Sequence, residues 1–180
     1  MPRPAIFFDR DGVINLSPGE GYVLNWEAFH FSDGIMAATK LCKDLGYALV
    51  LVTSQQGVGK GLISQQTLDD IHARMQQELA AQGAAFDRIE ACTHLSGTCT
   101  CRKPSPEMIL DAAAALDLDL GNSWLIGDHD RDIQMAINAG VPHTIRVLSH
   151  HQPGVAATHT VESTAELPAL LKGVLPGVVS

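Results

Sequence analysis

The chain has 180 residues, of which 46% are apolar and 18% charged, values typical of a globular domain whose core needs no disulfides. Its net charge of −8, without a dense Lys/Arg cluster, argues against nucleic-acid binding. No apolar run reaches the ~18 residues that span a bilayer, and residues 5–8 are too few for a secretion signal. We therefore expect a cytoplasmic protein without membrane contact.

Short apolar runs alternate along the chain with longer amphipathic segments. In chain order, the pattern predicts a strand at 5–8, a helix at 34–45, a strand at 48–52, a helix at 64–82, a weaker strand at 88–91, a helix at 105–116, a strand at 124–126, a helix at 131–139, a strand at 144–147 and a helix at 164–171. Such alternation favours the α/β class, a doubly wound parallel sheet with helices on both faces. We expect one domain over residues 1–180, without a large cap domain.

Chemically interesting residues follow the predicted strands, where ligands bind in doubly wound folds. Asp9-Arg10-Asp11-Gly12 comes directly after the first strand. Hydrolysis of a phosphate monoester through an aspartyl-phosphate needs one carboxylate as nucleophile and a second carboxyl group as acid and base. Two carboxyl groups in different environments can hold these roles. Taken alone, however, this motif favours a polar turn in which an Asp caps a helix.

Three further segments accompany this acidic turn: Thr53 after the second strand, Lys103 before a helix, and Gly127-Asp128-x-x-x-Asp132 after a later strand. Together they resemble the four signatures of the haloacid dehalogenase superfamily. The resemblance implies that Asp9 is the nucleophile and Asp11 the general acid and base. It also implies Mg²⁺, a cation that prefers oxygen ligands and keeps several waters. Its ligands would be the Asp9 and Asp128 side chains and the Asp11 backbone carbonyl.

The same resemblance assigns the phosphoryl oxygens to the Thr53 hydroxyl and the Lys103 ammonium group. Asp132 would orient Lys103 or a metal-bound water, whereas we interpret Asp130 as a solvated surface acid. The second signature departs from the related sequences, which usually have Thr-Asn-Gln where this chain has Thr53-Ser54-Gln55. The glycine-rich stretch 57–61 lacks the spacing of a nucleotide-binding loop, so we expect a mobile loop near the site.

A cluster of metal-ligand residues precedes Lys103. Cys92, His94, Cys99 and Cys101 provide three thiolates and one imidazole, a closed tetrahedral set of the kind that structural zinc takes. Free buried cysteines, or a Cys99–Cys101 redox pair, are the alternatives. A structural Zn²⁺ in the loop 92–103 would order it and hold Arg102 and Lys103 at the mouth of the site.

The cysteine-containing loop, leading into Cys101-Arg102-Lys103-Pro104, resembles two related phosphatase families. One hydrolyses D-glycero-D-manno-heptose 1,7-bisphosphate to the 1-phosphate, and the other hydrolyses histidinol phosphate. The first is favoured, although the short spacing between His94 and Cys99 is closer to the second. The resemblance assigns small-molecule substrate binding to Gly19, Glu20, Gly21, Tyr22, Ser54, Gln55, Arg102 and His129. A zinc-stabilised binding module without catalysis is a remote alternative, and a monomer is the default expectation.

Overall fold

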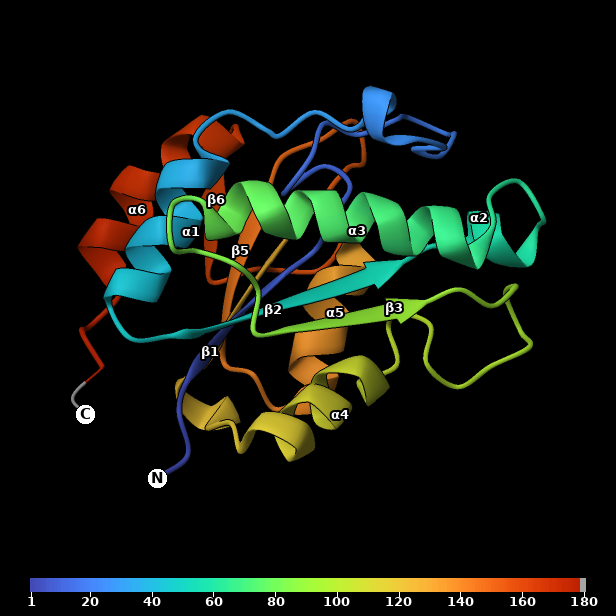
Figure 1. Cartoon of the computed structure of the whole chain (residues 1–180). Helices are drawn as coiled ribbons and strands as arrows, with labels where there is room; N and C mark the ends of the chain where they lie inside the picture. Colours follow the sequence, from blue (N-terminus) through green and yellow to red (C-terminus); the bar gives the residue numbers. More distant parts are fainter. Residues whose placement is uncertain (179–180) are drawn as a thin grey trace.

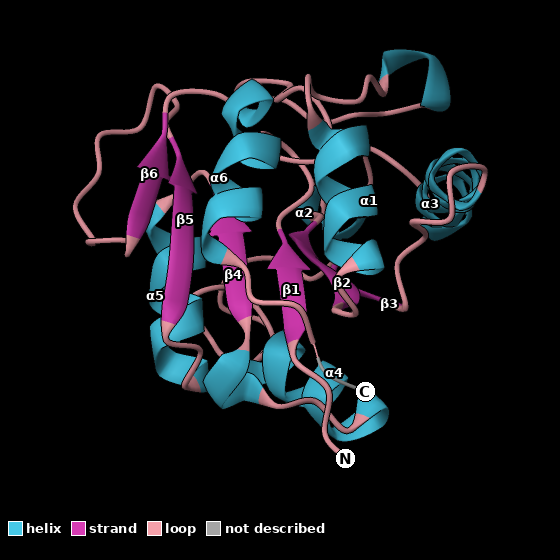
Figure 2. Ribbon diagram, turned by 90° about the vertical axis from the view of Figure 1, so that its left-hand side faces the viewer, coloured by secondary structure: helices cyan, strands magenta, loops and turns pink. Residues whose placement is uncertain are grey.

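The computed structural model describes residues 1–178 and confirms the expected α/β architecture. The strands of one parallel sheet lie in the order β3-β2-β1-β4-β5-β6. Their bounds are β1 (Ala5–Phe8), β2 (Ala48–Ser54), β3 (Arg88–Cys92), β4 (Trp124–Gly127), β5 (His143–Val147) and β6 (His159–Val161). Figure 2 shows the strand arrows running in one direction, so the carboxyl ends of the strands meet at one edge of the sheet.

Helices cover both faces of this sheet (Figure 1). Side chains alternate along β1, so that Ile6 and Phe8 pack with α1, α3 and α6, whereas Ala5 and Phe7 pack with α4 and α5. The central strands β1, β2 and β4 are almost fully apolar because both of their faces are buried. The helices are α1 (Ile35–Asp44), α2 (Gln56–Gly59), α3 (Gln65–Ala80), α4 (Glu107–Leu116), α5 (Asp130–Ala139) and α6 (Leu167–Val174).

The structure differs locally from the sequence pattern, including two unpredicted 3₁₀ turns, Trp26–Ala28 and Leu120–Asn122. The sequence pattern did not predict β6, because a strand of three residues with one buried side chain leaves no apolar run. The stretch expected to be a loop at 57–61 begins as the short helix α2. The helix expected at 164–171 starts as a 3₁₀ turn (Thr164–Glu166) and continues as α6 to Val174. None of the helices within residues 1–178 is long and apolar enough to cross a membrane.

Candidate active site

The carboxyl edge of the sheet carries a polar cavity of about 180 Å³. Asp9 leaves β1 and Asp128 leaves β4, and these two strands are neighbours in the sheet. Lys103 reaches the same place from the segment that precedes α4. The cavity is lined by Asp9, Asp11, Ser17, Pro18, Gly19, Glu20, Gly21, Tyr22, Ser54, Gln56, Arg102, Lys103, Asp128, His129, Arg131 and His151.

Lys103 is the buried cation of this site. Its Nζ donates to Asp9 Oδ1 at 2.7 Å and to Asp132 Oδ1, also at 2.7 Å. The Lys103 side chain is only 1% exposed, so both ion pairs lie away from bulk water. Burial alone would lower the pKa of Lys103, but the Asp132 and Asp9 carboxylates more than offset this and hold the pKa above its usual value. Lys103 is therefore charged at neutral pH.

The carboxylates around Lys103 carry more negative charge than this one cation balances. Oxygens of Asp9, Asp128 and Asp132 lie within 4.8 Å of one another. Burial, followed by the Asp132 carboxylate, raises the pKa of Asp9 well above its ordinary range, although Lys103 opposes the shift. The same two causes raise the pKa of Asp128. Three carboxylates beside one ammonium group leave the site with net negative charge. Such a site suits a divalent cation that prefers oxygen ligands.

Asp132 organises the turn between β4 and α5. Its Oδ2 accepts the backbone N–H groups of Asp128 and His129 at 3.2 and 3.1 Å, while its Oδ1 accepts from Lys103. A Cβ at Gly12, where φ is +87°, would collide with the Asp128 carboxylate. Glycine at position 12 therefore lets the acidic turn after β1 approach Asp128 closely.

His129 caps the amino end of α5. Its Nδ1 accepts the backbone N–H of Arg131 at 3.2 Å, so the neutral ring carries its proton on Nε2. Burial, together with the nearby Arg131 and His151, lowers the pKa of His129 and favours this neutral form. The ring lines the cavity, where Nε2 is a potential donor.

Thr53 and Gln55 are not among the residues that line the cavity. Both are almost fully buried, and Gln55 Nε2 donates to Thr53 Oγ1 at 2.8 Å and to Asp11 Oδ2 at 3.2 Å. Lys60 Nζ lies 5.3 Å from the Tyr22 ring centroid, and Lys60 does not line the cavity.

Sequence reasoning missed two cationic or potentially cationic residues of the cavity, Arg131 and His151. His151 lies in the segment that follows β5, so the rule that site residues follow strands would have found it.

Asp130, at the start of α5, holds the segment that follows β5. Asp130 is partly exposed, as expected of a surface acid, and its Oδ1 accepts from the buried Arg146 Nη1 at 2.7 Å and from the Gly154 N–H at 2.9 Å.

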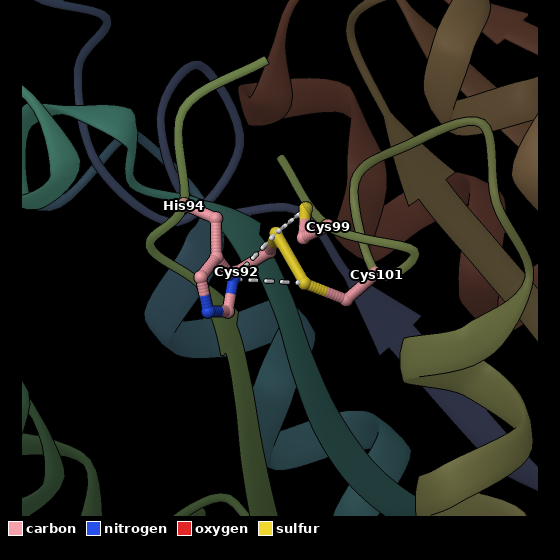
Figure 3. Close-up of side chains that lie close together, drawn as sticks. All are labelled: Cys92, His94, Cys99 and Cys101. Carbon is pink, nitrogen blue, oxygen red and sulfur yellow. Dashed lines mark hydrogen bonds between the residues drawn. A yellow bond between two sulfur atoms is a disulfide. The ribbon is translucent and has the colours of Figure 1, made fainter. Parts of the chain in front are cut away.

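The cysteine-containing loop brings its four predicted zinc ligands together (Figure 3). Their ligand atoms all lie within 4.8 Å of one another, an arrangement that could hold a metal ion. The structure joins Cys92 and Cys101 by a disulfide and leaves Cys99 as a free thiol. Cys99 Sγ lies 3.5 Å from Cys92 Sγ, and His94 Nδ1 lies 3.4 Å from Cys101 Sγ. A disulfide and a zinc ion bound by these thiolates are alternative states of the same sulfur atoms.

Comparisons with known proteins relate this architecture to phosphatases. The HAD-hydrolase-like family model matches residues 100–170. A D-glycero-beta-D-manno-heptose-1,7-bisphosphate 7-phosphatase of Yersinia pestis is 35% identical over 94% of this chain and 95% of its own length. A protein of the same name from Vibrio cholerae is 36% identical, covering 95% of this chain and 97% of its own.

Solved structures give the same relationship. The crystal structure of D,D-heptose 1,7-bisphosphate phosphatase from B. bronchiseptica, complexed with magnesium and phosphate, has a TM-score of 0.86 and 31% sequence identity. The match covers 94% of this chain and 98% of that one. A second heptose bisphosphate phosphatase, from Burkholderia thailandensis, shares the fold with a TM-score of 0.67 at 23% identity.

Proposed function

This chain belongs to the haloacid dehalogenase-like phosphatases, and we propose on that premise that it hydrolyses D-glycero-D-manno-heptose 1,7-bisphosphate to the 1-phosphate. The observation that carries the proposal is the convergence of Asp9, Lys103 and Asp128 at a polar cavity on the carboxyl edge of the sheet. Relatives at 35% and 36% identity that bear the name of this activity support the choice of substrate class.

The proposed reaction has two steps at phosphorus. A carboxylate oxygen of Asp9 attacks the 7-phosphoryl group, the bond to the sugar oxygen breaks, and Asp11 donates a proton to that leaving oxygen. Water then attacks phosphorus in the aspartyl-phosphate and loses a proton to Asp11, which releases inorganic phosphate and restores Asp9. Lys103 already contacts Asp9 Oδ1 at 2.7 Å, so its charge is positioned for the phosphoryl oxygens.

Mg²⁺ is the proposed metal of this site, and the excess of carboxylates over cations supports that assignment. The Asp9 and Asp128 side chains and the Asp11 backbone carbonyl would hold it. When bound, the ion offsets the repulsion between the carboxylates and the anionic substrate and stabilises charge during transfer.

The remaining assignments concern the substrate. Thr53 would donate its hydroxyl to the transferred phosphoryl group, and Gln55, its hydrogen-bond partner, holds it in place. Ser54 lines the cavity, and its buried hydroxyl has no hydrogen-bond partner within residues 1–178. Arg102 and His129 would bind the second phosphate, and the segment from Gly19 to Tyr22 would contact the sugar. A monomer, a single domain and a cytoplasmic location remain predictions.

Arg102→Ala should raise KM for the bisphosphate by roughly 10–100-fold, because a guanidinium fork contributes ~1.5–3 kcal/mol to binding a charged oxygen group. The effect on a sugar monophosphate should be several-fold smaller, since Arg102 would contact the second phosphate. Steady-state kinetics on both substrates measure the difference, and Arg74→Ala, an exposed position on α3, is the matched control. Equal losses on both substrates would show that Arg102 does not bind the second phosphate.

We propose that the reduced loop binds Zn²⁺ through Cys92, His94, Cys99 and Cys101. A disulfide accounts for two of these side chains, whereas a tetrahedral zinc site accounts for the convergence of all four. Zinc would have no open coordination position here, so its role would be to order the segment that carries Arg102 and Lys103.

Cys99→Ser separates the two states, because Cys99 lies outside the Cys92–Cys101 disulfide. Protein purified under reducing conditions should contain about one zinc per chain, and Cys99→Ser should lower that content and reduce kcat/KM by at least roughly tenfold. Elemental analysis and kinetics measure both effects, with the buried Cys42→Ser as control for zinc content. Unchanged metal content and activity in Cys99→Ser would show that the loop does not need zinc and that the Cys92–Cys101 disulfide orders it.

Histidinol phosphate is the second candidate substrate, favoured by the short spacing between His94 and Cys99. The decisive test compares kcat/KM for heptose 1,7-bisphosphate and histidinol phosphate with magnesium present. We expect a preference of at least about tenfold for the bisphosphate, because only that substrate offers a second phosphate to Arg102 and His129. A preference for histidinol phosphate would overturn the substrate assignment but not the phosphatase activity.

A further inference from the structure

Arg10 lies between the two catalytic carboxylates in the sequence, yet its side chain is fully buried and does not line the cavity. Its Nε and Nη2 donate to Asp11 Oδ1 at 3.2 and 2.9 Å. Its Nη1 lies 3.1 Å from His72 Nε2, on the buried face of α3. Within residues 1–178, the sole ion pair of Arg10 is the one with Asp11. Burying a guanidinium group costs desolvation free energy, so the burial of Arg10 against a single carboxylate oxygen suggests a role beyond packing.

His72 fixes the other end of the Arg10 side chain. Arginine has only donors, so His72 Nε2 must accept in this contact, and the ring must be neutral. Burial and the Arg10 charge lower the pKa of His72 to about 4, which agrees with a neutral acceptor at physiological pH. The Arg10 guanidinium also lies 5.9 Å from the centroid of the Phe29 ring. Arg10 is thus held between α3 and Asp11.

The two oxygens of Asp11 have different surroundings. Oδ1 accepts from Arg10 and from Asn15 Nδ2 at 2.9 Å, and both partners can only donate. The Asn15 amide orientation is supported by its second contact, with the Leu16 carbonyl at 3.1 Å. Oδ2 accepts a single longer hydrogen bond of 3.2 Å from Gln55. Oδ1 thus accepts three hydrogen bonds and Oδ2 accepts one, so Oδ2 is the less occupied oxygen of Asp11.

We propose that Arg10 is a positioning residue that anchors Oδ1 of Asp11 and thereby presents Oδ2 as the proton-transferring oxygen, with His72 holding Arg10 in place. This inference rests on the proposed role of Asp11 as general acid. Arg10 and His72 would then support the reaction without contacting the substrate. Asn15 would help to hold Oδ1, whereas Gln55 contacts Oδ2.

The test uses the leaving group, because a general acid matters only when the leaving oxygen needs a proton. A sugar alkoxide needs one, whereas p-nitrophenolate leaves without it. We compare kcat/KM, which covers the reaction only up to departure of the leaving group, for heptose 1,7-bisphosphate and p-nitrophenyl phosphate. Arg10→Lys should lose roughly 10–100-fold on the sugar phosphate and less than about threefold on p-nitrophenyl phosphate.

Further variants separate positioning from folding. His72→Leu removes the acceptor for Arg10 and should show the same substrate-selective loss, whereas His72→Gln keeps an acceptor and should recover most of the activity. Arg88→Lys is the control, since Arg88 also pairs with one carboxylate, Glu90, and neither residue lines the cavity. It should change both kcat/KM values by the same factor. Equal losses on both substrates in Arg10→Lys, or failure of His72→Gln to exceed His72→Leu, would overturn the inference.

Asp11→Asn distinguishes failure of the inference from failure of the proposed function. If Asp11→Asn itself shows no substrate-selective loss, the general-acid role is wrong and the inference falls with it. If Asp11→Asn shows the loss and Arg10→Lys does not, Asp11 is the acid and Arg10 does not position it.

Discussion

Asp9→Asn should lower kcat by at least roughly 10⁴-fold, because the amide cannot form the covalent phosphoryl intermediate. The fold should survive, since the Asn carbonyl oxygen can still accept from Lys103, which now contacts Asp9 Oδ1 at 2.7 Å. The raised pKa of Asp9 means that its ionised form destabilises the metal-free fold at neutral pH. The metal-free variant should therefore unfold at the same temperature as the wild type or higher.

Steady-state kinetics and thermal unfolding measure the two effects of Asp9→Asn. Asp111→Asn, an exposed position on α4, removes the same charge far from the cavity and should leave kcat unchanged. Substantial turnover by a folded, homogeneous Asp9→Asn protein would remove Asp9 from the role of nucleophile.

Lys103→Met should lower kcat by roughly 10²–10³-fold, because it removes a preorganised charge next to Asp9. It should also cost about 3–5 kcal/mol of unfolding free energy, since Asp9 and Asp132 would remain buried without their cation. The double variant Lys103→Met/Asp132→Asn should recover part of the stability without recovering activity. The double variant thus separates the contribution of Lys103 to stability from its contribution to catalysis.

Denaturant unfolding and kinetics at a temperature where each variant is folded measure both effects. Lys43→Met is the control, because Lys43 also pairs with a carboxylate, Asp87, but is partly exposed. That pair should contribute about 0–1 kcal/mol. Wild-type kcat in folded Lys103→Met protein would contradict the assignment of Lys103 to the phosphoryl group.

The main architecture could be predicted from the sequence because parallel strands that are buried on both faces leave continuous apolar runs. The residues 48–52 form such a run, and the structure buries every side chain in it. The short strand β6 (His159–Val161) leaves no such signal, since Val161 alone is buried. The helix α2 (Gln56–Gly59) contains two glycines, which have low intrinsic helix propensity, so local sequence could not identify it.

Part of the site was also predictable, because several of its residues lie at the ends of strands that the sequence pattern identifies. Asp9, Thr53 and Asp128 end or follow strands, so the topology brings them to one edge. The contact between Arg10 and His72 was not predictable, because the two residues are 62 positions apart and meet only after α3 packs against the sheet. The ion pair of Asp130 with Arg146 was not predictable for the same reason, since Arg146 lies on β5 and meets Asp130 only in the folded chain.

The most direct test of the account is identification of the phosphorylated residue. In Asp11→Asn, the first step should proceed with p-nitrophenyl phosphate, whereas the second should stall for lack of a base to activate water. Acid quenching, borohydride reduction and peptide mass spectrometry would then locate the acyl phosphate as homoserine. We predict homoserine at position 9. Its appearance at another aspartate, or release of p-nitrophenol at the wild-type rate without any trapped residue, would contradict the account.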